Sequence, residues 1–293
     1  MCFFILFVSP GKIMKITLCI CTMNRPIDLK NCLNAIFKAT YQPDEIIVSD
    51  DSQDGTPTKK IVQLFSKVTY QEGPHRGLGP NRNACIRSAT GDYLIFIDDD
   101  VCVATDFIQN VQALLGVVPE KTIITGYELN YLQGFPEKIK PHNADFWGFQ
   151  KVPVTDTYRS IVINASVFPS QLFQEISFDE NLRYGCDEID VAQHATALGY
   201  EIEYSDEIHV NHYPSPINRD HYKRFVNASR IYIMTKSYWK YDKSILKAVF
   251  FLIFAPLQIM GSSVRHRDKG QFLDAFYSLK MAIGYLSKSN LIH

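Results

Sequence analysis

Three consecutive aspartates follow a short apolar run about a third of the way along the chain. Asp98, Asp99 and Asp100 come directly after residues 93–97, whose aromatic and β-branched side chains predict a buried strand. Carboxylates at the end of such a strand face the crevice where open α/β sheets bind ligands. Because like charges this close repel, a divalent cation is a suitable partner, and carboxylate-bound Mg²⁺ often also binds substrate phosphates. The residues therefore indicate a metal-dependent enzyme for a phosphorylated or nucleotide substrate, with a solvated loop or helix cap as the alternative.

A second acidic cluster lies in the later part of the chain. Asp187, Glu188 and Asp190 follow Gly185 and open a segment with apolar residues at helical spacing, which ends at Gly199. Such a cluster of carboxylates is a candidate functional site. The alternative is that they only complement the dipole of the helix, as acidic residues in a first turn often do.

The net charge of −1 conceals a strong asymmetry along the chain. Residues 216–293 contain 13 Lys and Arg against 4 Asp, a net of +9, whereas residues 1–215 carry a net of −10. The acidic part suits a cation site, and the basic part suits an anionic surface such as a membrane face. Nucleic acid fits less well, because long apolar runs interrupt the basic residues. Seven scattered cysteines without paired spacing argue against disulfides and zinc, and indicate a reducing compartment.

The pattern of apolar residues predicts strands that alternate with helices. We expect strands at 16–21, 45–48, 68–70 and 93–97, and helices at 26–39, through 61–65 and at 81–89. Such alternation predicts a mostly parallel, doubly wound sheet flanked by helices. Beyond Asp100 we expect a helix near 105–115, a strand at 122–125, an irregular substrate-facing segment over 127–157 and a β-like segment at 160–164.

The two ends of the chain depart from this pattern. Residues 1–13 carry an apolar run too short to span a bilayer and are interpreted as an extension ahead of a start at Met14. Residues 248–264 are uncharged and largely apolar, with Lys and Arg on both sides. This arrangement predicts a helix that lies in a membrane interface. A buried core or dimer helix is the alternative, and a spanning helix would need about 20 apolar residues.

Four stretches together resemble the family 2 inverting glycosyltransferases. Residues 22–26 with 45–56 resemble the opening of that family, and residues 79–84 with 91–100 resemble its central signature with the DXD element. Residues 185–191 are similar to its acceptor-side acidic motif, and residues 210–212 to the histidine that follows. The resemblance implies a GT-A fold over 14–215, with a Rossmann-like, mostly parallel sheet flanked by helices. A basic and apolar helical C-terminal region would cover 216–293.

The resemblance also implies a role for each matching residue. The donor would be bound by seven residues: Thr22, Asn24, Arg25, Asp51, Arg82, Asp98 and Asp99. Among these, Asp51 would accept from the base edge, which suits a uracil N–H. Mg²⁺ or Mn²⁺ would be held by Asp100, Asp98 and His212. The general base falls on Glu188 by position, with its neighbour Asp187 as the alternative, and Asp190 would lie on the acceptor side.

The implied enzyme is a metal-dependent inverting glycosyltransferase of the hexosyltransferase type. It would move a sugar from a nucleotide-sugar, foremost a UDP-sugar, to a hydroxyl of a glycan or lipid-linked acceptor in polysaccharide biosynthesis. The location implied is cytoplasmic and peripheral on the inner face of the cell membrane. A sugar-1-phosphate nucleotidyltransferase is one alternative, but residues 22–25 lack the Gly-rich, Lys- or Arg-bearing loop it needs. A non-catalytic carbohydrate-binding protein on the same fold would leave both acidic clusters without a task.

Overall fold

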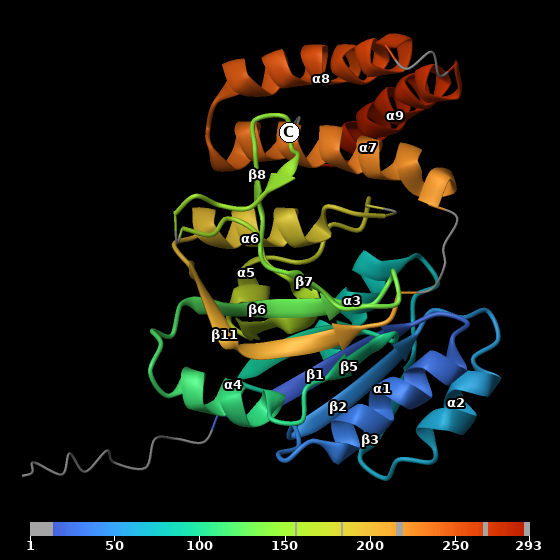
Figure 1. Cartoon of the computed structure of the whole chain (residues 1–293), viewed down its shortest axis with the longest axis vertical. Coiled ribbons are helices and arrows are strands. Elements are labelled where there is room, and N and C mark those ends of the chain that lie inside the picture. Colours follow the sequence, from blue (N-terminus) through green and yellow to red (C-terminus); the bar gives the residue numbers. More distant parts are fainter. Residues whose placement is uncertain (1–13, 156, 183, 215–218, 266–268, 290–293) are drawn as a thin grey trace, which may run out of the picture.

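The computed structural model describes residues 14–155, 157–182, 184–214, 219–265 and 269–289 (Figure 1). Within these ranges the chain forms a central sheet with helices on both faces and a further layer of helices beyond one face. The α/β fold predicted from the alternation of strands and helices is confirmed. The extension expected at 1–13 lies outside the described residues.

The first half of the sheet is parallel, as the sequence predicts. β1 (Ile16–Thr22) pairs with β2 (Glu45–Asp50) and with β4 (Tyr93–Asp98), and β2 pairs with β3 (Val68–Glu72). Every residue of β1 is buried, as expected of a central strand that is covered on both faces. Parallel pairing brings the carboxyl ends of these strands to one edge of the sheet, so the loops that follow them meet there.

The second half of the sheet contains antiparallel pairs. β10 (Ser166–Pro169) runs antiparallel to β4 and to β6 (Thr122–Asn130), and β11 (Glu201–His212) runs parallel to β6. β5 (Val101–Val103) and β7 (Glu137–Ile139) pair antiparallel with β11 and β6. The last residues of β11 thereby lie beside the segment that directly follows the three aspartates.

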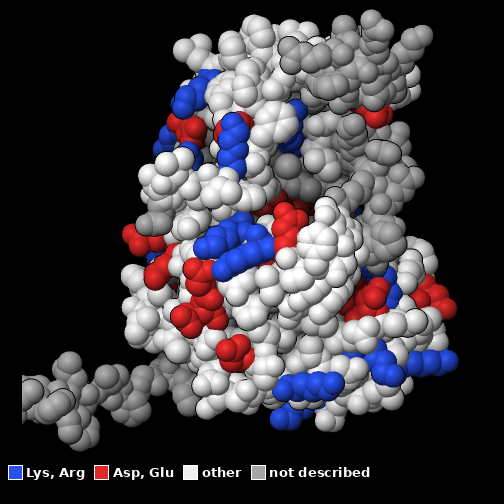
Figure 2. Space-filling view, in the orientation of Figure 1, with Lys and Arg blue, Asp and Glu red and all other residues white. Residues whose placement is uncertain are grey.

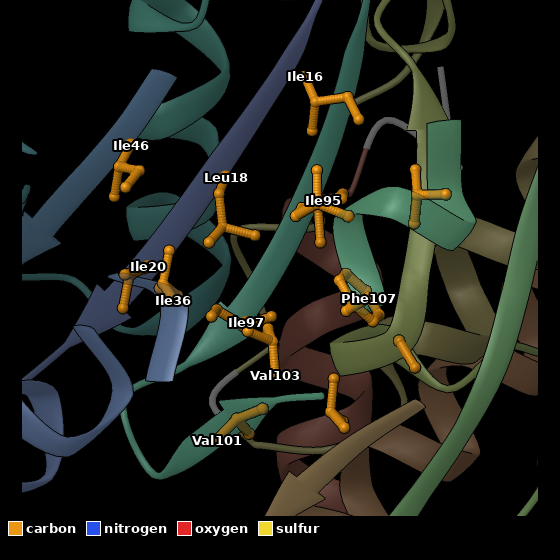
Figure 3. Close-up of a cluster of buried hydrophobic side chains, with 14 of the residues drawn as sticks. Ile16, Leu18, Ile20, Ile36, Ile46, Ile95, Ile97, Val101, Val103 and Phe107 are labelled. Atoms are coloured by element: carbon orange, nitrogen blue, oxygen red, sulfur yellow. The ribbon is translucent and has the colours of Figure 1, made fainter. Parts of the chain in front are cut away.

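The period of two along the strands divides the core between the two faces of the sheet. Ile16, Leu18 and Ile20 of β1 face α1 (Pro26–Lys38) and α4 (Phe107–Leu115), as Figure 3 shows for part of this cluster. The intervening Cys19 and Cys21 belong to the cluster on the other face. That face is covered by α3, α5 and α6, which span Leu78–Ser88, Leu172–Glu175 and Asp187–Ala197. A further helix near the sheet, α2 (Thr56–Val62), packs beside α1 and β3.

The C-terminal helices form a separate layer above α6 (Figure 1). α7 (Arg219–Lys236) continues into a π-helical turn, Ser237–Tyr241, which is followed by α8 (Ile245–Arg265) and α9 (Lys269–Lys288). Their core cluster also takes in Cys186 and Ile189 at the start of α6, so the layer packs directly on the acidic cluster of the sequence. Among the described helices, none combines the length and apolarity needed to cross a membrane.

Two expectations differ from the structure. The prediction of a β-like segment at 160–164 is wrong, because Ile163–Ala165 is a 3₁₀ turn and the strand begins at Ser166. Side chains satisfy the backbone here, since Val162 N–H donates to Thr125 and Ser166 donates to Val162 C=O. The segment 127–157 is more ordered than expected, because β6 and β7 enter it and a small hairpin follows. The hairpin strands are β8 (Asn143–Ala144) and β9 (Gln150–Lys151).

Candidate active site

The loop after β4 is joined to the loop after β1. Thr22 Oγ1 donates to Asp99 Oδ2 over 2.7 Å, and Arg25 Nη1 lies 2.7 Å from Asp99 Oδ1 and 3.0 Å from Asp100 Oδ2. Burial raises the pKa of Asp99 to about 7, although Thr22 and Arg25 oppose this shift. Asp99 is thus turned toward β1 and the start of α1. The structure brings together three residues that the sequence placed on the donor side.

His212, at the end of β11, lies between two carboxylates. Its Nε2 is 3.4 Å from Asp100 Oδ1, and its Nδ1 is 3.1 Å from Glu128 Oε1 on β6. Burial opposes the charged ring, but hydrogen bonds to both carboxylates raise the pKa of His212 to about 10. Burial also acts against the charge of Asp100, yet His212 and Arg25 hold the pKa of this carboxyl below its ordinary value.

These groups fit a divalent cation in part. Within the described ranges, no group of three or more His, Cys, Asp or Glu side chains is already spaced to hold a cation. Asp100 and His212 nevertheless converge, and Glu128 fixes the other ring nitrogen as carboxylates do behind metal-bound histidines. Mg²⁺ needs only one or two protein ligands when substrate phosphates supply the rest. Asp98, the third expected ligand, is directed to an arginine instead.

Arg82 on α3 is buried and stands between the two acidic clusters. Its Nη2 is 3.2 Å from Asp98 Oδ1, its Nη1 donates to Asp187, and its guanidinium lies 5.3 Å from the ring centre of Phe178. Burial opposes the charge, but Asp187 and Asp98 raise the pKa of Arg82 above its ordinary value. The sequence assigned Arg82 to the donor, and that role stays a prediction. Its two ion pairs also connect the end of β4 to the start of α6.

The acceptor-side cluster opens α6. Gly185 and Cys186 both have positive φ, +80° and +68°, and this pair of left-handed residues turns the chain into the helix. The carboxylate of Glu188 accepts from Gln150 Nε2 over 2.8 Å. Burial, with the charge of Asp187 beside it, raises the pKa of Glu188 to about 7. Of the two candidates for the base, Asp187 is paired with an arginine, whereas Glu188 has a pKa suited to proton transfer near neutral pH.

Asp190 lies on the other side of the same helical turn. Its Oδ2 is 2.8 Å from Lys236 Nζ of α7, and its Oδ1 accepts from Tyr241. Lys236 also pairs with Asp179 at 2.8 Å, so one nearly buried ammonium joins two segments to the C-terminal layer. The acceptor-side role of Asp190 stays a prediction, and its observed contacts fix α6 to α7.

The expected nucleobase end of the site is built from the loops after β1 and β2. Asp51 accepts backbone N–H groups from His75 at 2.6 Å and Gly77 at 2.7 Å, one on each carboxylate oxygen. Asn24 adopts a left-handed conformation, and its N–H donates to Ser52 over 2.7 Å. Each oxygen of Asp51 can accept a further hydrogen bond, so the predicted contact with a base edge stays compatible with this loop.

The comparisons with known proteins agree with this geometry. Residues 17–151 match the sequence model of glycosyl transferase family 2. This match agrees with the resemblance that the motifs carry. Glycosyltransferase GlyA of Streptococcus pneumoniae is 23% identical over 180 residues, covering 56% of this chain and 26% of that protein. GalNAc(5)-diNAcBac-PP-undecaprenol beta-1,3-glucosyltransferase of Campylobacter jejuni is 30% identical over 96 residues, 29% of each protein. This chain spans about a quarter to a third of the length of these two relatives.

Solved structures share the fold. GalNAc-T7 with UDP, GalNAc and Mn²⁺ has a TM-score of 0.59 and 16% identity, over 83% of this chain and 55% of that one. The mannosyltransferase PcManGT from Pyrobaculum calidifontis, in complex with GDP-Man and Mn²⁺, has a TM-score of 0.59 and 15% identity over 96% of this chain and 89% of that one. The resemblance to family 2 and the GT-A fold predicted from the motifs are confirmed.

Proposed function

We propose that this chain is an inverting, divalent-metal-assisted glycosyltransferase that uses a nucleotide-sugar, foremost a UDP-sugar, as its donor. The observation that carries the proposal is the arrangement of the two acidic clusters: Asp100 converges with His212, while Glu188 accepts from Gln150 beside an arginine-paired Asp187. The match to the family model and the structural neighbours with bound UDP or GDP-Man and Mn²⁺ support the donor class and the metal.

On the donor side, Asp100 and His212 would hold Mg²⁺ or Mn²⁺, which would neutralise the departing diphosphate. Arg25 and Thr22 fix Asp99 behind this pair, so the carboxylates keep their positions when the donor arrives. Asp51 would accept from the base edge, and Asn24 would also contact the donor. Asp98 would contact the ribose or the metal, with Arg82 next to it.

On the acceptor side, Glu188 would accept the proton of the attacking hydroxyl. A carboxyl with a pKa near 7 is partly ionised at neutral pH and still basic enough to take that proton in the transition state. The acceptor oxygen then bonds to the anomeric carbon from the face opposite the diphosphate. The bond between the sugar and the diphosphate breaks, and its electron pair leaves with the diphosphate. One displacement of this kind inverts the anomeric configuration.

We further propose a lipid-linked acceptor in polysaccharide biosynthesis, reached from the inner face of a membrane. One face of α8 is apolar and exposed over three turns, through Leu246, Val249, Phe250, Ile253, Phe254 and Leu257. Exposed Lys240, Lys243 and Lys247 adjoin its start with Trp239, and α8 contains no acidic residue. Figure 2 shows Lys and Arg side chains toward one end of the described part of the helical layer. Apolar faces with basic rims bind anionic lipid surfaces.

A ligand-stability panel tests the proposed donor and metal. The chain is heated with each of a set of nucleotide-sugars, with and without Mn²⁺, and the midpoint of unfolding is recorded. We expect a rise with one donor that requires Mn²⁺, because ligands that bind only the folded state stabilise it. Parallel measurement of released nucleoside diphosphate shows turnover. Neither stabilisation nor release with any donor would overturn the proposal.

A further inference from the structure

The hairpin of β8 and β9 reaches from the C-terminal helices to the acidic cluster of α6. Gln150, on β9, donates through Nε2 to Glu188 Oε1 over 2.8 Å. We propose that Gln150 is a positioning residue for the carboxylate of Glu188, held in place because α7 anchors the tip of its hairpin. The inference rests on the proposed role of Glu188 and extends it to a segment outside the resemblance motifs.

The tip of the hairpin is anchored to the C-terminal layer by polar contacts and by ring contacts. Arg230 of α7 donates to Trp147 C=O, and its guanidinium lies 4.5 Å from the ring centre of Phe149. Tyr238 donates through its hydroxyl to Phe146 C=O over 2.7 Å, and the two rings stack at 5.4 Å. Contacts on both sides of the turn leave the hairpin little freedom to move away from α7.

The turn itself is tightly specified. Asp145 Oδ1 accepts from the backbone N–H groups of Trp147 and Phe149 over 2.9 and 3.0 Å. Gly148 has φ of +77°, and a Cβ there would come within 2.7 Å of Met234 Cγ and 2.8 Å of Arg230 Cγ. Only glycine fits this turn against α7 without a shift of its neighbours. Gln150 follows two residues later, so its side chain starts from a fixed backbone.

The hydrogen bond acts on a carboxylate that other charges also influence. Asp187 and Cys186 precede Glu188 on the same segment, and Arg82 approaches from α3. Asp187 disfavours the charged form, whereas Arg82 favours it. The neighbouring Asp190 is paired with Lys236, and Arg230 and Asp145 lie at the hairpin tip. An amide N–H donates a stronger hydrogen bond to a carboxylate than to a neutral carboxyl, so Gln150 favours the charged form of Glu188. Because it contacts Oε1, it leaves Oε2 for the acceptor.

The test replaces Gln150 by methionine, which keeps the length of the side chain and removes the donor. We expect the acid limb of kcat/KM against pH to move upward by about one pH unit, with the KM for the donor unchanged. The matched control is Gln109→Met, on the exposed face of α4. An unmoved acid limb would overturn the inference.

A second readout separates this inference from the proposed activity. NMR titration of the ¹³C-labelled carboxyl of Glu188 in the whole chain, without substrates, needs no turnover. The same upward shift is expected in Gln150→Met, even if no donor is ever turned over. Gly148→Ala tests the anchoring, and we expect a shift in the same direction. A titration of Glu188 unchanged by both substitutions would contradict the inference.

Discussion

Arg82 and Asp187 form an ion pair that joins α3 to the first turn of α6. The same guanidinium lies 3.2 Å from Asp98, so one buried cation holds the ends of both acidic segments. Because the negative charge of Asp187 is paired with Arg82, Asp187 is a poor candidate for the general base. Glu188, one residue later, accepts only the amide of Gln150 among the described side chains. This difference between neighbours assigns the two carboxylates different tasks.

Activity is expected to fall on the acidic side of neutrality. The pKa of Glu188 is raised to about 7, and only the carboxylate form can accept the proton of a hydroxyl. As pH falls through 7, Glu188 takes up its proton, and kcat/KM should drop about tenfold for each further pH unit. A rate profile between pH 5 and 9 measures this. A profile that is flat down to pH 5 would exclude Glu188 as the base.

Loss of Arg82 is expected to destabilise the fold strongly. Arg82→Met removes the buried guanidinium and leaves the partly buried Asp98 and Asp187 without their partner, for which the loss of a fully buried pair, about 3–5 kcal/mol, is the upper bound. The matched control is Arg76→Met, which removes an exposed pair with Glu180 worth about 0–1 kcal/mol. Urea unfolding of both variants gives the two free energies. Equal losses would show that Arg82 does not hold the two segments.

Metal affinity is expected to depend on Glu128 as well as on the two proposed ligands. Asp100→Asn and His212→Gln each remove a proposed ligand, whereas Glu128→Gln removes the charge beside Nδ1 of His212. We expect Glu128→Gln to weaken Mn²⁺ binding by about 10- to 100-fold. Electron paramagnetic resonance of free Mn²⁺ in the presence of UDP measures this, with exposed Glu137→Gln on β7 as the control. Unchanged affinity in all three variants would place the metal elsewhere.

The face of α8 is expected to bind anionic vesicles. Leu246→Glu with Ile253→Glu puts two charges on the exposed apolar face at positions outside the core cluster of the layer. Sedimentation with vesicles that contain anionic phospholipid should retain the wild-type chain and lose this variant. Val117→Glu, on an exposed position beyond α4, is the control. Retention of the double variant, or no retention of the wild type, would contradict the membrane proposal.

The sequence predicted most of the elements that carry the site, because strand ends and helix starts are marked by local signals. Asp98–Asp100 follow an apolar strand, and Glu188 follows a glycine that opens a helix. Glu128 was missed, since its position beside His212 depends on the pairing of β6 with β11 across 84 residues. Lys236 and Gln150 were missed for the same reason. Both side chains contact carboxylates of α6, and no apolar period within α7 or the hairpin predicts those contacts.

The most direct measurement compares Glu188→Gln with Asp187→Asn in the transfer reaction. Both variants are incubated with Mn²⁺, the donor selected by the stability panel and its acceptor, and the released nucleoside diphosphate is measured. Glu188→Gln should lower kcat by about 10²- to 10⁴-fold while the donor still stabilises the chain. Asp187→Asn should retain more activity, since it changes the partner of Arg82 and leaves the base in place. Normal turnover in Glu188→Gln, or the larger loss in Asp187→Asn, would contradict the assignment of the base.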